Sequence, residues 1–176
     1  YGGFSGTETF REQRDVVQHA TVMDGESARR CLFCSAAAVI DGFTITGGQT
    51  IPAWNQYYGG GLFLRGNPVI SNCMILANRA DRGGGLYAEN GTMKLTNCVF
   101  AQNVGTQDVG GAVYSGGTLT SVSLMNCTLA SNQAFSDGGG AYNGGLSLTV
   151  SNSIFWGNTP NQIRSNMGTN VRYSDI

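Results

Sequence analysis

The chain has 176 residues, of which 27 are glycine and only 12% are charged, and its formal net charge at pH 7 is −1. Ten basic residues against eleven acidic ones leave no positive excess that would attract nucleic acid or an anionic membrane surface. No apolar run reaches the roughly 18 residues that a membrane-spanning helix needs. We therefore expect neither a nucleic-acid partner nor membrane insertion by this segment.

Residues 1–48 contain two copies of a strand-and-corner pattern. In each copy an apolar stretch runs into an Asp-Gly pair, at Asp24-Gly25 and at Asp41-Gly42. Apolar residues at every second position indicate a strand, and a glycine lets the chain turn where it ends. We predict short N-terminal coils over residues 1–48.

The longest insertion between repeats follows this region and is rich in aromatic residues. It contains Trp54, Tyr57 and Tyr58. These side chains either contact a ligand or cover the side of the coils, and the sequence leaves both readings open.

Residues 59–158 contain a motif that recurs four times. Each copy begins with a glycine-rich triplet, at Gly59, Gly83, Gly110 and Gly138. Further along each copy stand two asparagines six residues apart; the first set is Asn72, Asn97, Asn126 and Asn152, and the second is Asn78, Asn103, Asn132 and Asn158. Self-similarity at 20 to 30 residues is typical of solenoid proteins, in which each repeat packs on its neighbours.

The first asparagine of each copy marks a corner. Apolar residues alternate on both sides of it, but their parity changes there, and strand alternation has a period of two. Asparagine and glycine adopt the left-handed conformation of a corner at low cost. Stacked copies would align like residues into ladders: an inward thiol ladder of Cys73, Cys98 and Cys127, and a hydrogen-bonded ladder of Asn78, Asn103, Asn132 and Asn158.

These patterns predict an all-β fold, a right-handed single-stranded parallel β-helix (β-solenoid) of about six to seven coils. Residues 1–176 would form one domain, in which residues 59–158 provide four regular coils. An unpaired sheet edge would remain at each end of the stack, which favours end-to-end homo-oligomers.

The motifs resemble those of bacterial extracellular β-helix proteins of the choice-of-anchor Q type. The likeness rests on Tyr1-Gly2-Gly3-Phe4, on Asp41-Gly42-Phe43 with its flanking residues, and on the Gly-Gly and Asn-Cys repeats, which are also similar to polymorphic outer-membrane protein repeats. It implies a secreted or cell-surface location and a chain that is a fragment, truncated at one or both ends. For activity the resemblance implies little, because the repeat reflects stacking.

Acidic residues recur before three of the glycine triplets, at Asp81, Asp108 and Asp137, and Arg82 follows the first of them. Aspartate before a turn commonly bonds local backbone, which is the structural interpretation. Stacked carboxylates would also suit calcium, and with Arg82 they form the candidate catalytic set of a polysaccharide lyase or glycoside hydrolase. No other cofactor is expected.

An aromatic residue follows each triplet, which gives the column Phe63, Tyr87, Tyr114 and Tyr142. Pointing inward, this column is core; pointing outward, it is a surface on which sugar rings could stack. Its parity is opposite to that of Leu62, Leu86 and Val113, so the two sets face opposite ways.

Together these features favour a non-catalytic structural or display module, adhesive or carbohydrate-binding, with glycans or host and cell-surface components as partners. The polysaccharide-cleaving enzyme is the alternative.

Overall fold

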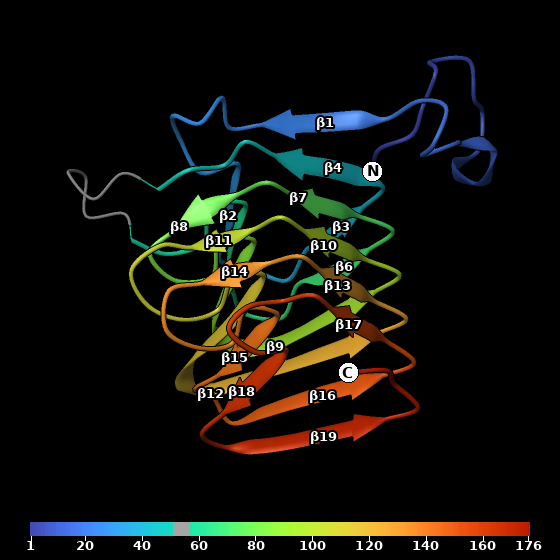
Figure 1. The fold of residues 1–176 in the computed structure, drawn as a ribbon. Coiled ribbons are helices and arrows are strands. Elements are labelled where there is room, and N and C mark those ends of the chain that lie inside the picture. Colours follow the sequence, from blue (N-terminus) through green and yellow to red (C-terminus); the bar gives the residue numbers. More distant parts are fainter. Residues whose placement is uncertain (51–56) are drawn as a thin grey trace.

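The computed structural model describes residues 1–50 and 57–176, and these form a parallel β-solenoid of about five turns (Figure 1). All pairings between its strands are parallel, and successive coils supply neighbouring strands. The described residues contain no α-helix, only a short 3₁₀-helix at Arg11–Gln13. The all-β parallel solenoid predicted from the repeats is confirmed. Six to seven coils are too many, because residues 1–20 form no strand.

One side of the solenoid is a six-stranded sheet built from the segment that follows each corner. Its strands, in spatial order, are β1 (Thr21–Asp24), β4 (Phe43–Thr46), β7 (Met74–Leu76), β10 (Val99–Ala101), β13 (Thr128–Ala130) and β17 (Ile154–Trp156). A narrower three-stranded sheet comes next along each coil and comprises β8 (Arg79–Ala80), β11 (Val104–Gly105) and β14 (Gln133–Ala134).

The remaining side carries two columns of strands that the long central strands join. The first column contains β2 (Leu32–Cys34), β5 (Leu62–Arg65), β9 (Leu86–Thr96), β12 (Val113–Met125), β15 (Ala141–Asn143) and β18 (Ile163–Ser165). The second contains β3 (Val39–Asp41), β6 (Val69–Ser71), the later halves of β9 and β12, β16 (Ser147–Ser151) and β19 (Gly168–Arg172).

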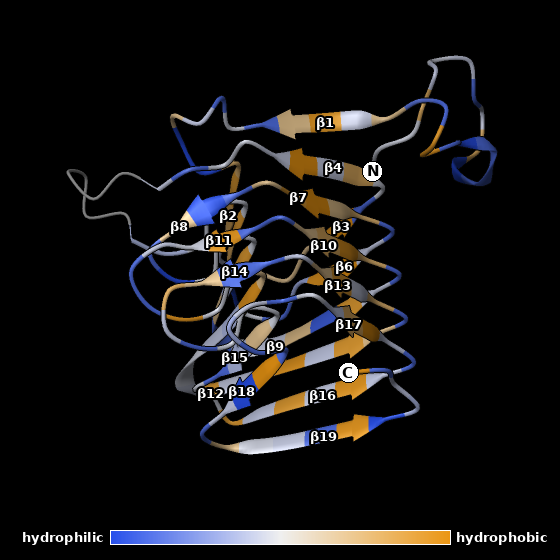
Figure 2. Cartoon of the chain, viewed as in Figure 1, coloured by the Kyte–Doolittle hydropathy of each residue, from blue (hydrophilic) through white to orange (hydrophobic). Residues whose placement is uncertain are grey.

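The core runs along the axis as stacks of like side chains. Ile75, Phe100, Leu129 and Phe155 lie in register on neighbouring strands, and each is at most 1% exposed. Cys73, Cys98 and Cys127 stack beside them, buried and free of disulfides, and Ser153 continues this ladder. Figure 2 shows the apolar residues concentrated on the strands and the polar ones in the connecting loops. The predicted thiol and apolar ladders are confirmed.

The corners at the first asparagines and at Gly42 (φ 80°) adopt the left-handed backbone conformation that the sequence predicts. Asn72, Asn97, Asn126 and Asn152 have φ between 49° and 55°. The corner predicted at Asp24-Gly25 is wrong: Thr21 pairs with Phe43 and Asp24 with Thr46, so β1 belongs to the column of strands that follows the corner.

The sequence does not predict the next turn of each coil. Its left-handed residue is the one just before the second asparagine, and residues of these types seldom adopt such a conformation: Ala77, Gln102 and Ser131, with φ of 52° to 58°. Such a φ is costly for these residue types, so the surrounding contacts must hold it in place.

Candidate functional site

The second asparagines form a buried ladder along the core. Asn103 is fully buried; its Nδ2 donates to the Ile75 carbonyl at 2.8 Å and to Asn132 Oδ1 at 2.9 Å. Its Oδ1 accepts from the backbone and side chain of Asn78, both at 3.1 Å. Asn132 repeats the arrangement toward Asn158. The predicted ladder is confirmed, and its function is structural because every amide group has a partner in a neighbouring coil.

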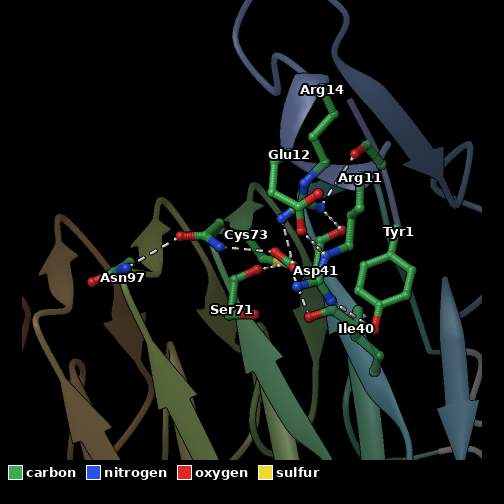
Figure 3. A network of polar contacts seen from close by, with 11 residues as sticks. Tyr1, Arg11, Glu12, Arg14, Ile40, Asp41, Ser71, Cys73 and Asn97 are labelled. Carbon is green, nitrogen blue, oxygen red and sulfur yellow. Dashed lines mark hydrogen bonds and ion pairs between the residues drawn. The ribbon is translucent and has the colours of Figure 1, made fainter. Parts of the chain in front are cut away.

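Three of the first asparagines, Asn72, Asn97 and Asn126, form a second, exposed ladder that ends at a carboxylate, and Figure 3 shows the part from Asn97 to Asp41. Asn126 donates to Asn97 and Asn97 to Asn72, each at 3.2 Å, and Asn72 donates to Asp41 Oδ1 at 2.8 Å. Arg14 Nη2 lies 2.6 Å from Asp41 Oδ2, and both side chains are mostly buried. This ion pair ties residues 1–20 to the solenoid. Burial alone would raise the pKa of Asp41, but the hydrogen bond from the Asn72 amide and the Arg14 guanidinium more than offset it and lower the pKa.

The aromatic column lies on the side of the strands opposite the core residues Leu62, Leu86 and Val113. Two of its members are nevertheless buried: Phe63 is 9% exposed and Tyr87 is 6% exposed. Tyr87 stacks on Tyr114 with centroids 5.0 Å apart, and Tyr114 stacks on Tyr142 at 5.4 Å. Tyr58 belongs to the aromatic insertion before Gly59, here called the aromatic loop, and stacks on Tyr87 with centroids 4.6 Å apart. Phe63 contacts the Tyr87 ring edge-on. Because the rings stack along the axis, their faces contact one another and their edges face outward. A sugar approaching the half-buried Tyr114 and Tyr142 would meet ring edges and hydroxyls, whereas Phe63 and Tyr87 expose little surface.

The aromatic loop and two of the three aspartates meet at one hollow. Its volume is about 250 Å³, and it is lined by Tyr57, Tyr58, Asp81, Arg82, Gln107 and Asp108. The rings of Tyr57 and Tyr58 are 6.2 Å apart and tilted by 56°. The hollow therefore brings together residues of the two predicted sets, the aromatic insertion and the acidic residues before the glycine triplets. Trp54, the third predicted aromatic residue of this loop, lies outside the described residues.

Within the hollow the charges are unequally paired. Arg82 Nε and Nη2 lie 2.6 and 2.5 Å from Asp108 Oδ2. Asp81 Oδ1 accepts a hydrogen bond from Thr106 Oγ1 at 3.1 Å, and no described basic side chain forms an ion pair with Asp81. Burial lowers the pKa of Arg82, but Asp108 more than offsets this, so the pKa of the guanidinium is raised. Arg82 is therefore a poor proton acceptor.

Asp137 does not join the other two aspartates. It lies beside Val109 in the register, its carboxylate accepts from Asn161 Nδ2 at 2.5 Å, and Arg164 Nε is 3.4 Å away. The described part of the chain has no group of three or more His, Cys, Asp or Glu side chains arranged to hold a metal ion. Calcium takes six to eight oxygen ligands. The aspartate trio does not fit that ion, and calcium binding stays a prediction without geometric support.

Gln107 is the lining residue that the sequence did not single out. It lies in the loop between β11 and β12, where no repeat or motif marks it. Only the bend of this loop brings it to the aromatic residues.

Comparison of the chain with protein-family models, with curated proteins and with solved structures found no match. Among residues 1–50 and 57–176 there is also no apolar helix of the length that a bilayer crossing requires. Fold and geometry thus define a parallel β-solenoid whose connecting segments at Tyr57, Asp81 and Gln107 form a hollow lined by polar and aromatic residues.

Proposed function

We propose that the chain is a non-catalytic structural and display module of a secreted or cell-surface bacterial protein, which contacts carbohydrate through the hollow at Tyr58 and Asp81. The repeat likeness to choice-of-anchor Q and polymorphic outer-membrane proteins supports the location. The single observation that carries the carbohydrate contact is the composition of the hollow: tyrosine rings beside carboxylate, guanidinium and amide groups. Sugar-binding sites combine these features, because rings pack against C–H faces while polar groups fix the hydroxyls.

A rigid scaffold is the second element of this proposal. The buried asparagine ladder and the aromatic column link neighbouring coils. The loops that line the hollow are therefore held by strands whose relative positions are fixed. A preorganised surface loses little conformational entropy on binding, which suits adhesion.

A glycan array tests the proposal directly. We expect the wild-type protein to retain a subset of glycans, and Tyr58→Ala to lose that retention while it keeps the wild-type circular dichroism spectrum. Asn97→Ala, on the opposite corner ladder, serves as the matched control and should bind like the wild type. If no glycan class is retained, the carbohydrate contact is wrong.

The alternative is a polysaccharide lyase or glycoside hydrolase, and one observation favours it: Asp81, Arg82 and Asp108 share the hollow. Against it, Asp108 holds Arg82 and raises its pKa, and the third predicted catalytic residue, Asp137, lies elsewhere. Polysaccharide turnover that Asp108→Ala abolishes would establish the enzyme. Glycan binding without turnover supports the display module.

A further inference from the structure

The charge balance of the hollow points to a class of ligand. Its lining contains two carboxylates and one guanidinium, and the guanidinium is committed to Asp108 through two donors on one oxygen. The lining therefore carries one excess negative charge, on Asp81. An acidic sugar would meet this charge without gaining Arg82, whose release would leave Asp108 unpaired.

Asp81 is the group available to a cation. Of its two oxygens, Oδ1 accepts from the neutral Thr106 hydroxyl, and Oδ2 forms no hydrogen bond or ion pair with the described residues. Arg79, two residues earlier, lines a separate hollow with Thr106 and forms no ion pair with Asp81 among the described contacts. A carboxylate at an open hollow attracts a positive charge and disfavours a negative one.

The tyrosines favour the same charge. A cation within about 6 Å of a tyrosine ring centroid is stabilised by the negative ring face. The Arg82 guanidinium already lies 5.7 Å from the Tyr58 ring centroid. Tyr57 provides a second ring next to that of Tyr58. Tyr57, Tyr58 and Asp81 line the same hollow, so an ammonium group bound in it would have a carboxylate and tyrosine rings among its neighbours.

We propose that the hollow recognises a sugar with a free amino group, whose ammonium pairs with Asp81 while its hydroxyls bond Gln107 and the Arg82–Asp108 pair. This inference rests on the proposed carbohydrate contact and narrows it to amino sugars. A lysine side chain offers the same ammonium on an aliphatic stem. It would leave Gln107 and the paired charges without partners, and unpaired polar groups at a binding site reduce affinity.

Calorimetric titration with four matched hexasaccharides tests the assignment: glucosamine, N-acetylglucosamine, glucose and galacturonate oligomers. We expect the glucosamine hexamer to bind about tenfold more tightly than the acetylated and neutral ones, and galacturonate to bind weakest. Asp81→Asn should remove the preference for glucosamine. Asp137→Asn, an aspartate paired on the same side of the solenoid but outside the hollow, should leave it intact.

The outcomes distinguish amino-sugar recognition from the broader proposal of carbohydrate binding on which it rests. Equal affinity for the amino and acetylated hexamers, or an unchanged preference in a folded Asp81→Asn variant, overturns the amino-sugar assignment while carbohydrate binding stands. Tighter binding of a lysine hexapeptide than of the glucosamine hexamer also overturns it. Failure to bind any of the four sugars overturns both.

Discussion

The two asparagines of each coil, only six residues apart, have opposite environments. Asn97 is exposed and turns the backbone through a φ of 55°, whereas Asn103 is buried and satisfies amide groups of two neighbouring coils. At the first position the residue type matters for its conformation, and glycine meets that need equally well. At the second position the side-chain amide itself is required, because truncation leaves buried polar groups without partners.

We therefore predict that Asn103→Ala lowers the free energy of unfolding by on the order of 3 kcal/mol, since several buried hydrogen bonds are lost. Asn97→Ala should cost about 1 kcal/mol, and Asn97→Gly less than that. Urea unfolding followed by circular dichroism measures all three. Equal losses for Asn103→Ala and Asn97→Ala would contradict the distinction.

The Arg14–Asp41 pair predicts a pH-dependent stability. The pKa of Asp41 is lowered in the folded chain, so its contribution is complete above the ordinary carboxyl pKa of 3.8 and is lost as the pH falls through the lowered value. Asp41→Asn should cost about 2 kcal/mol at neutral pH, between the values for exposed and buried pairs. Its deficit against the wild type should stay constant down to about pH 5 and shrink below pH 4. A deficit that grows in acid would contradict the ion pair.

At the scale of the elements, the aromatic column connects strands β5, β9, β12 and β15 on the side opposite the core. The half-buried Tyr114 stacks on a ring on each side, and Arg82 lies 6.0 Å from its centroid. Burial raises the pKa of the Tyr87 and Tyr114 phenols, which accordingly stay neutral at physiological pH. The column therefore stabilises the stack through its rings and not through charge.

Tyr114→Ala should lower the free energy of unfolding by about 2 to 3 kcal/mol, because it removes both stacking contacts. Tyr114→Phe keeps the ring and should change stability by less than about 0.5 kcal/mol. Thermal unfolding of the two variants compares them directly. If Phe costs as much as Ala, the hydroxyl and not the ring stabilises the column.

The sequence predicts the elements better than the hollow, for a physical reason. Repeats at fixed offsets force like residues into register, so the Cys73 ladder and the Asn78 ladder follow from spacing alone. The hollow depends on how loops of unequal length bend. One signal was nevertheless present: Asp81 and Asp108 stand two residues before their triplets, whereas Asp137 stands immediately before Gly138. This difference of one residue in spacing pairs Asp137 with Val109 and not with Asp108.

At the scale of the whole molecule, the two ends of the solenoid present open sheet edges. In the second column of strands, Val39 of β3 and Asn170 of β19 lie at opposite ends of one register. Among the described residues neither strand pairs with a second strand, and the outer edge of β3 is contacted at its last residue, where the Gly2 backbone N–H donates to the Asp41 carbonyl at 2.8 Å. Unpaired parallel edges form a template for another copy. In a head-to-tail stack Asn170 of one molecule would lie next to Val39 of the next.

End-to-end association is accordingly our proposal for the isolated chain. Light scattering should show a mass that rises with concentration, and the double substitution V39K/N170K should reduce it to the monomer through repulsion. The matched pair V39K/N170E should restore association. A wild-type mass that stays monomeric across the concentration range would contradict the proposal.

Register between coils is the claim on which the hollow, the ladders and the ends all depend. It can be measured with pyrene labels on cysteines introduced into a variant whose native thiols are replaced by serine, the residue that already continues the ladder at Ser153. The Asn97 and Asn126 side chains lie 3.2 Å apart on adjacent coils. Asn72 and Asn152 are three coils apart, about 14 Å at the usual strand spacing. Labels at 97 and 126 should give strong excimer fluorescence and labels at 72 and 152 little; equal excimer signals from the two pairs would contradict the stacked register.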